Sequence, residues 1–549
     1  MVALRRLSPC SLPRLITLSC VTAVITGIGF CRAADRAALG ELSPAEKKIQ
    51  EAISRGQSDP ILLTPPDNVV DAQVLAKWII APPSNEESAP LQIRIAGAEI
   101  INDLDLSDRE IVREVTFINC TIDGEVTFER SDAKRSISFI GCTFNRSPTF
   151  QDAAIEGDFE LTGTQFLDER RQVNFQRIAL GSEFHLQKAV FSGGADFYHS
   201  HWKGLVHMDG TRFGKDVRFD NLKSEDDILG DGVVFDGKVS FDSAEAKGIY
   251  LWRCKFTGPC EFRRNTISRS IGFRNDTFGD HFSFQENSID QNLDLTNAQF
   301  TKRHSSAVTP TTENGLIDVD LSRTHVGAFT QFNNATISGF LSLEECDLHD
   351  LNLEGVQPWR RDKRMTRLTN STIRRFDGRS AGDFLLFVDR SEFDRGVYSQ
   401  LESFLKGEGQ GDDANQVFIH QQTRDRHTKS TVAAHLKNWI WFLVSGYGRE
   451  PWLALVWSAG VVAFGSILFW RSSDMELRDA KFAGRKYNPI WFSLDLFAPI
   501  IDLESASVWC PRSDRFGKWF YFRVHRILGW ILVPIGIVAI TGVLQGGSQ

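Results

Sequence analysis

The chain has little excess charge of either sign, which limits the partners it can be expected to bind. Its 62 Lys and Arg residues against 70 Asp and Glu residues give a formal charge of −8 at pH 7, a mild value for 549 residues. Such a balance implies no large polyanionic partner, and we predict no nucleic-acid partner. The mild acidity does not by itself indicate a nucleic-acid mimic either.

Sequence motifs for cofactor chemistry are also missing. The chain contains no dinucleotide-binding glycine fingerprint, no redox CxxC pair and no haem-attaching CxxCH, and its 9 cysteines lack metal-ligand spacing. Carboxylates are scattered in numbers too large to single out a catalytic pair. We therefore predict no cofactor and assign no catalytic, cofactor-binding or metal-binding residue. Whether the protein is an enzyme stays open, with the non-enzymatic alternative favoured.

The first 34 residues resemble a secretory signal. Arg5, Arg6 and Arg14 give a basic start, and residues 15–30 are an apolar run without charge. Small residues at Cys31 and Ala33 occupy the two positions that a signal peptidase recognises, so cleavage after Ala33 is expected. An uncleaved membrane anchor is the alternative.

Two long uncharged runs lie near the other end of the chain, at residues 452–470 and 527–544. Each is long enough to cross the hydrocarbon layer, so we predict transmembrane helices over 452–470 and 519–544. The positive-inside rule puts the connection 471–518 in the cytoplasm and the body of the chain on the extracytoplasmic side of the inner membrane. The basic residues of this connection are Arg471, Arg478, Lys481, Arg485, Lys486, Arg512, Arg515 and Lys518.

The connection also contains an apolar segment, residues 489–503. It is too short to span the membrane and carries Asp495 and Asp502. We expect it to be amphipathic and to lie in the membrane interface or to enter the membrane part-way.

Large apolar residues, most often Phe, recur at steps that alternate between five and six positions. Neither a helix, with a period of 3.6, nor an ordinary strand, with a period of 2.0, gives this spacing. A chain that turns a corner after every short extended segment does. The first stretch of these apolar centres is Ile95, Ile100, Leu106, Ile111, Phe117, Ile122, Phe128, Phe139, Phe144, Phe150, Ile155, Leu161 and Phe166, with Ala133 filling the one gap.

The residue two positions before each apolar centre also points inward, because strand side chains alternate. Small and larger residues alternate at this inner position, which would fill a narrow square interior without voids. Five cysteines occupy it: Cys120, Cys142, Cys254, Cys260 and Cys346. We interpret them as small core residues. Cys120 and Cys142 are expected to stack on adjacent coils, with a disulfide as the alternative in an oxidising compartment.

Triplets such as Val115-Thr116-Phe117 and Cys142-Thr143-Phe144 and their spacing resemble those of pentapeptide-repeat proteins, whose fold is a four-sided right-handed β-helix. This chain departs from the simplest pattern, because its alternating steps imply about 22 residues per coil. It also favours Phe where the best-known members have Leu. The resemblance implies an all-β right-handed parallel β-helix (solenoid) of about twelve coils over 91–355, preceded by a helical capping segment at 35–90. Loops are expected at 167–172, 223–231 and 301–314.

After Leu353 the periodicity is lost and a basic stretch follows. We expect an irregular basic end of the rod at 356–395, where a solvated loop is the main interpretation and contact with anionic lipid headgroups the alternative. A short helical linker is expected at 396–451, with helices over 398–405 and 414–423. This linker is similar to one in membrane-bound pentapeptide-repeat proteins, some of which are named membrane-associated oxidoreductases. The basic residues are Arg360, Arg361, Lys363, Arg364, Arg367, Arg374, Arg375 and Arg379.

The histidines give a weaker pattern. In the repeat, His185, His201 and His207 each precede an apolar centre and therefore point outward. His185 and His207 are expected to stack on adjacent coils, and a stacked pair is able to hold a metal. Solvated histidines on the face of a rod are far commoner, so we predict no metal site. The densest group of metal-ligand residue types is Asp196, His199, His201, His207 and Asp209.

Two classes of function remain open. The first is a non-enzymatic binding or scaffolding module of the cell envelope, anchored in the lipid bilayer, whose flat faces contact envelope proteins or polymers. The second is a two-span channel or transport-associated protein, although the chain lacks a Thr-Val-Gly-Tyr-Gly filter. An exported envelope enzyme or redox protein is a weaker alternative. The DNA-mimic role of some pentapeptide-repeat proteins is disfavoured by export and by the modest acidity.

Overall fold

A computed structural model describes residues 42–80, 91–301, 319–337, 339–356, 366–428, 452–482, 484–498 and 503–541, and a few residues between 439 and 448. The chain divides into two units, the first ending at Val397 and the second beginning at Tyr398. The predicted signal at 1–34 lies outside the described residues.

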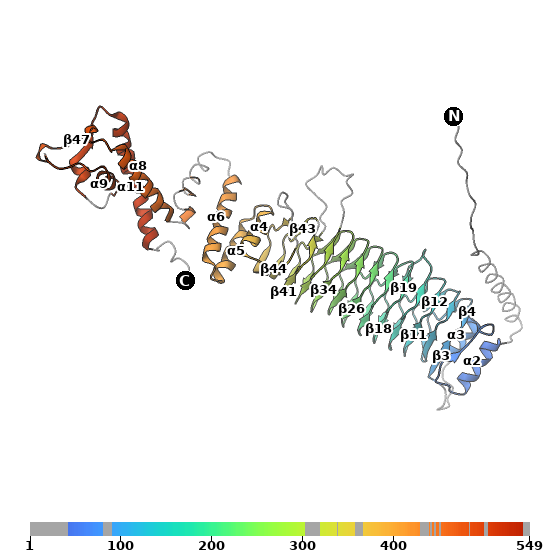
Figure 1. Ribbon diagram of the computed structural model, residues 1–549. Coiled ribbons are helices and arrows are strands. Elements are labelled where there is room, and N and C mark those ends of the chain that lie inside the picture. Colours follow the sequence, from blue (N-terminus) through green and yellow to red (C-terminus); the bar gives the residue numbers. More distant parts are fainter. Residues whose placement is uncertain are drawn as a thin grey trace, which may run out of the picture. The chain divides into compact units, whose positions relative to one another are not determined.

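The first unit is a parallel β-solenoid of about 12 turns (Figure 1). One coil contains four short strands, β7 (Glu114–Ile118), β8 (Thr121–Ile122), β9 (Val126–Thr127) and β10 (Asp132–Ala133). The next coil repeats them, because β11 (Ile137–Ile140), β12 (Thr143–Phe144) and β13 (Ala154–Ile155) pair in parallel with β7, β8 and β10. Val115 pairs with Ile137, and Ile137 with Phe159, which confirms the predicted coil of 22 residues.

The corners of the coil are formed by residues in the left-handed backbone region. Asn119, Arg130 and Gly141 have φ angles of 51°, 54° and 63°. A single residue with positive φ bends an extended chain sharply within one position, which allows strands of two residues to follow one another around a square.

The interior consists of stacked aromatic columns. From Phe144 onward, one side of the coil places a Phe ring on every turn as far as Phe300, and consecutive ring centroids lie 4.7–5.3 Å apart. The rings are nearly parallel, as expected when identical side chains occupy equivalent positions of a parallel sheet. A second column runs from Phe128 to Phe284 on another side. The predicted apolar centres are therefore the core.

The inner positions also hold the polar groups that tie coils together. Thr211 Oγ1 donates to the carbonyl of Leu186 at 2.7 Å, and Ser200 Oγ donates to that of Phe175 at 2.9 Å. The five cysteines occupy the same kind of position, where they are buried free thiols. Cys142 Sγ, for example, lies 3.3 Å from the carbonyl oxygen of Phe117. The interpretation of these cysteines as small core residues is confirmed.

One predicted loop is absent. Residues 223–231, expected to break the coil, form β25 (Lys223–Ser224) and β26 (Ile228–Asp231), which pair with the neighbouring coils on both sides. The large-residue pattern disappears because small residues, Ser224 and Gly230, stand at two apolar centres. By contrast, residues 167–172 do form the expected loop between β15 (Gln165–Phe166) and β16 (Val173–Asn174). Of the third predicted loop, 301–314, only Thr301 is described.

The two ends of the solenoid differ in the elements that follow the regular coils. At the first end, β1 (Ile61–Leu62) and β2 (Val69–Asp71) pair with β3 (Gln92–Ala96) and β4 (Glu99–Ile101), accompanied by α2 (Pro44–Ser54) and α3 (Ala72–Ile80). At the other end, the stack continues past residue 355 through β45 (Thr366–Arg367) and β46 (Thr372–Asp377).

Helix α4 (Ala381–Asp389) then packs against this last coil. Thr366 donates to the carbonyl of Phe387, and the Phe376 and Phe384 rings lie 5.2 Å apart. The segment expected to be irregular therefore contains regular structure. Its periodicity is hidden in the sequence because Leu348 pairs with Ile373, a longer step than the 22-residue coil.

The second unit is mostly helical. After α5 (Arg395–Gly407) and α6 (Gly411–Thr428), which fall where two linker helices are expected, come α8 (Trp452–Leu468), α9 (Pro489–Phe497), α10 (Ser505–Val508) and α11 (Phe516–Thr541). A small antiparallel pair, β47 (Met475–Leu477) and β48 (Trp509–Pro511), precedes α11. Of the described residues, one helix is long and apolar enough to cross a membrane, over Phe516–Ile537, and α8 is apolar but shorter.

Candidate functional site

The most organised polar group on the solenoid surface is built around two histidines. His185 ends β18 (Phe184–His185) and His207 ends β22 (Val206–His207), and the two strands pair with these residues side by side. Their imidazole rings are stacked with centroids 5.3 Å apart and planes 4° from parallel. The predicted outward stack of His185 and His207 is thus confirmed.

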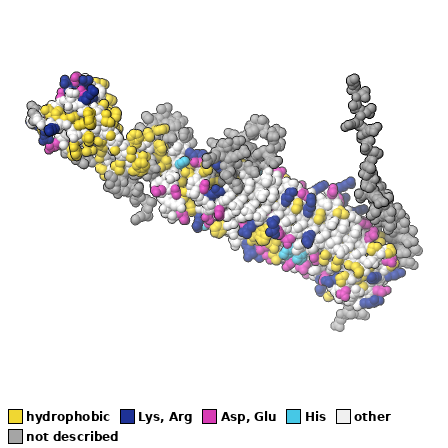
Figure 2. Space-filling view, in the orientation of Figure 1, with side chains coloured by type: hydrophobic (Ala, Val, Ile, Leu, Met, Phe, Trp, Pro, Cys, Tyr) yellow, Lys and Arg dark blue, Asp and Glu magenta, His cyan; other side chains and the backbone are white. Residues whose placement is uncertain are grey.

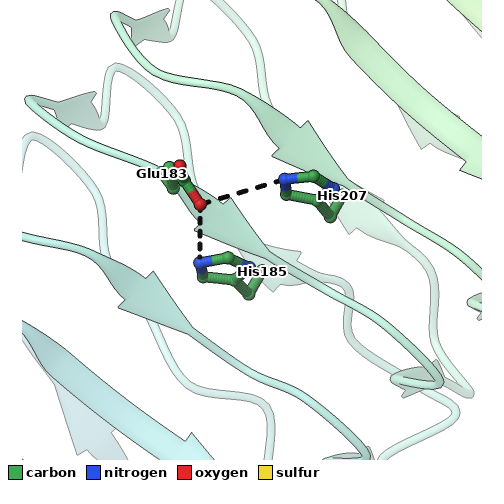
Figure 3. A group of neighbouring side chains, drawn as sticks. All are labelled: Glu183, His185 and His207. Carbon is green, nitrogen blue, oxygen red and sulfur yellow. Dashed lines mark ion pairs between the residues drawn. The ribbon is translucent and has the colours of Figure 1, made fainter.

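Glu183 completes the group from the corner that precedes β18. Its Oε2 lies 3.3 Å from His185 Nε2 and 3.9 Å from His207 Nε2 (Figure 3). One nitrogen from each ring and one carboxylate oxygen all lie within 4.8 Å of one another. The histidine side chains are 24% exposed and that of Glu183 is 47% exposed, so the group is open to solvent on one side.

The second ring nitrogen of His185, Nδ1, also has a neighbour. Gln187 Nε2 lies 3.4 Å from His185 Nδ1, and Gln187 Oε1 accepts from Thr162 Oγ1 at 3.3 Å. Glu160, at the end of β14 (Phe159–Glu160), is the partner of His185 on the preceding coil. Three consecutive coils therefore place Glu160, His185 and His207 at equivalent outward positions.

The other residues of the histidine-rich stretch are separated by the fold. His199 lies on an exposed corner with φ 58°, and His201 Nε2 is 2.7 Å from Glu225 Oε1 on the next coil. Asp196 forms an ion pair with Arg218 at 2.8 Å. Only His207 of the densest sequence group joins the cluster. Glu183 was missed, although its position two residues before His185 places it on the same side of an extended chain.

A buried acid stands inside the solenoid at an inner position. Asp276 lies two residues before Phe278, is fully buried, and accepts a hydrogen bond from the Cys254 backbone N–H at 2.7 Å. Its second oxygen, Oδ2, has no hydrogen-bond partner among the described residues. Burial raises the pKa of Asp276 to about 8. The carboxyl is protonated at neutral pH and is out of reach of any substrate.

Three of the four described basic residues of this stretch contact the end of the solenoid. Arg374 forms an ion pair with Asp347 at 2.9 Å, and Arg367 lies 3.5 Å from Glu344. Arg379 Nε donates to the carbonyl of Leu353 at 2.8 Å. Residues 357–365, which carry the Trp359–Arg364 part of the stretch, lie outside the described residues.

In the second unit, α9 lies against both α8 and α11. Ser493 Oγ donates to the carbonyl of Val462 in α8 at 2.8 Å, and His525 Nε2 of α11 lies 3.0 Å from the Ser493 carbonyl oxygen. Asp495, at the end of α9, accepts from the backbone N–H groups of Leu503, at 2.7 Å, and Ala506. The buried carboxylate therefore holds residues 503–506, the return segment between α9 and α11, against α9.

The surface of α8 and α11 is largely apolar. Figure 2 shows hydrophobic side chains covering the region of α8 and α11, in contrast to the mixed surface of the solenoid. Large apolar side chains that are more than half exposed occur on both helices, among them Val456, Phe464, Ile467, Ile527, Trp530 and Ile531.

Comparison of the chain with protein-family models, with curated proteins and with solved structures gives no match.

Proposed function

We propose that this chain is an exported pentapeptide-repeat protein of the cell envelope, held in the inner membrane by its second unit, whose β-helix acts as a non-enzymatic binding or scaffolding module. The observation that carries the proposal is the combination of an uninterrupted stack of strand rows with a separate apolar helical unit. A stack of similar coils offers flat, extended faces, which suit contact with proteins or polymers. The 22-residue apolar stretch Phe516–Ile537 of α11 has a length that suits the lipid bilayer.

The proposal includes two spans. Helix α11 satisfies the length requirement over Phe516–Ile537. Helix α8 has 17 residues, or about 25 Å, somewhat less than the roughly 30 Å hydrocarbon layer. Exposed Trp452 and Trp470 flank it at positions suited to the two interfaces. Local thinning of the bilayer accommodates a mismatch of this size at small cost.

In the proposed orientation, the connection 471–518 lies in the cytoplasm and the β-helix lies outside it. Reporter fusions test this orientation. Alkaline phosphatase fused within 471–518 should be inactive, and the same enzyme fused after Leu353 should be active, because phosphatase folds only outside the cytoplasm. Deleting residues 452–541, which contain both proposed spans, should also release the body from sedimented membranes. Active enzyme in the connection and inactive enzyme after Leu353 would place the β-helix in the cytoplasm and overturn the proposal.

The binding role needs its own experiment. A photocrosslinking residue at outward Thr143 or Thr277 should give one discrete crosslinked product in intact cells, since both side chains face away from the core. The same residue at Phe464, on the apolar surface of α8, is the matched control and should crosslink to lipid. If neither solenoid position gives a product under conditions where the control does, the scaffolding role is wrong.

A second candidate is a two-span channel or transport-associated protein. The arrangement that favours it is the short helix α9, which lies against both α8 and α11 with its return segment held by Asp495. Ion flux into liposomes that contain the purified full chain would distinguish it. Flux that disappears in Asp495→Ala but survives in Asp514→Ala, an exposed acid of the same connection, would favour transport over scaffolding.

A further inference from the structure

We propose that Glu183, His185 and His207 bind a divalent transition-metal ion, such as Zn²⁺, on the outer face of the solenoid. One nitrogen of each ring and one Glu183 carboxylate oxygen come together from two adjacent coils (Figure 3). The inference goes beyond a scaffolding role, and it does not depend on membrane anchoring because the site lies entirely within the first unit.

Two of the three distances between ligand atoms are already close to those of a metal site, and the third requires rotation of the histidine rings. Zinc ligands lie about 2.0–2.2 Å from the metal, so two ligands of a tetrahedral site are about 3.4 Å apart. The distance of 3.3 Å between Glu183 Oε2 and His185 Nε2 already matches this value, and the 3.9 Å to His207 Nε2 is about half an ångström longer. Rotation of the two rings toward each other brings the remaining pair, now within 4.8 Å, to the same separation.

The site is held by the most regular part of the molecule. His185 and His207 are fixed one coil apart by the β18–β22 pairing, and the Glu183 backbone N–H donates to Asp158 Oδ1 at 3.3 Å. Gln187 Nε2 lies beside the opposite nitrogen, Nδ1, of the His185 ring. A metal-bound histidine donates its second ring N–H to an acceptor, so metal-bound His185 requires the Gln187 amide to present Oε1 to Nδ1.

An ion pair accounts less well for this geometry. His201 and Glu225 show the ordinary arrangement in the same chain, one histidine with one carboxylate at 2.7 Å. In the cluster, two parallel rings share a single carboxylate oxygen, and two protonated rings stacked at 5.3 Å would repel each other. A dication instead takes both nitrogens as neutral ligands and the carboxylate as counter-charge.

The ligand set also indicates the class of ion. Two imidazoles and one carboxylate suit Zn²⁺ and other first-row transition metals, whereas Ca²⁺ and Mg²⁺ prefer oxygen ligands. Three protein ligands leave at least one coordination position to water or to a donor atom of a bound molecule. Zinc sites with an open position of this kind differ from structural sites, which are closed by four protein ligands.

Metal titration of the full chain in detergent micelles, purified without a polyhistidine tag and stripped of metal, tests the proposal. Calorimetry with Zn²⁺ should show one site that is lost in His185→Ala, His207→Ala and Glu183→Gln. Each ligand variant should weaken binding by more than about 100-fold, since changes to outer partners alone cost about 10–100-fold. Gln187→Ala should fall within that smaller range.

His201→Ala is the matched control, because His201 is also an outward histidine beside a carboxylate, and it should bind Zn²⁺ as the unaltered chain does. Co²⁺ serves as a spectroscopic probe and should give the visible bands of a nitrogen- and oxygen-ligated ion. A thiolate charge-transfer band, undiminished binding in His185→Ala, or equal loss in His201→Ala would overturn the proposal. Circular dichroism of each variant checks that the coils remain folded.

Discussion

Trp202 and Ser224 are partners on adjacent coils, so the largest side chain of the core lies against one of the smallest. Both stand at apolar centres, Trp202 at the end of β21 (His201–Trp202) and Ser224 at the end of β25, and both are buried. We infer that the large indole compensates for the small side chain at the same position of the following coil. Close packing of the interior thus extends across coils as well as within them.

This pairing predicts coupled effects of substitution. Ser224→Leu should lower the free energy of unfolding by about 1–3 kcal/mol, because it overfills the space beside the indole. Trp202→Leu should also destabilise, by leaving a cavity. The double variant Trp202→Leu/Ser224→Leu should lose less than the sum of the two. Denaturant unfolding of all four proteins measures the coupling, and additive losses would contradict the size compensation.

The same relationship explains why part of the fold could not be predicted from the sequence. The 22-residue coil, the inner cysteines and the stacked histidines follow from spacing alone, which is a local property. Continuation of the coil through 223–231 depends on larger neighbours that compensate for the small residues Ser224 and Gly230. At Gly230 an added Cβ would lie 2.8 Å from Val233 and 2.9 Å from Leu251, so the position has no room for the expected large residue.

The candidate metal cluster was predictable only in part, for a related reason. The periodicity places His185 above His207, but it does not determine that a corner residue, Glu183, turns its carboxylate toward both rings. The extension of the stack beyond residue 355 was likewise hidden, because Leu348 and Ile373 are paired across a longer step.

The aromatic column predicts local rather than global damage. Phe144 is buried, stacks on Phe166 at 4.9 Å and pairs with Ile122 on the other side. Phe144→Ala should cost about 3–5 kcal/mol. Because each coil contacts only its neighbours, hydrogen exchange should rise near Phe144 and remain unchanged near Phe284, whose own neighbours are Phe262 and the coil of β40 (Val319–Asp320).

Outward Thr143 provides the control for this experiment. Thr143→Lys should change the free energy of unfolding by no more than about 0.5 kcal/mol. A loss of protection spread evenly along the solenoid, or a Thr143→Lys change as damaging as Phe144→Ala, would contradict the stacked-column description.

The inner cysteines should tolerate replacement. Cys120 and Cys142 are buried free thiols on adjacent coils, and each Sγ lies near a backbone carbonyl oxygen of the preceding coil. Cys120→Ala and Cys142→Ala should each cost only about 1 kcal/mol, as small buried losses. Thermal unfolding with and without reducing agent measures this. Collapse of the fold on reduction would reveal a structural disulfide.

The buried acid makes stability depend on pH. Burial raises the pKa of Asp276 to about 8 from an ordinary value of 3.8. Below about pH 4 the carboxyl is neutral in both the folded and the unfolded chain, so it imposes no penalty. As pH rises from about 4 to 8, only the unfolded chain ionises, and Asp276 therefore lowers stability progressively through this window. Above pH 8 its effect is constant.

Asp276→Asn should remove this dependence. Asn265 and Asn287 occupy the equivalent inner position and donate to the carbonyls of Phe241 at 2.9 Å and Phe262 at 3.0 Å, so an amide fits the site without ionising. The melting temperature of Asp276→Asn should exceed that of the unaltered chain at pH 8, and the difference should shrink toward zero near pH 4. Asp294→Asn, which removes an acid from the outer face where it pairs with Arg274, should give no such gain. An equal difference between Asp276→Asn and the unaltered chain at all pH values would show that Asp276 is not a neutral buried acid.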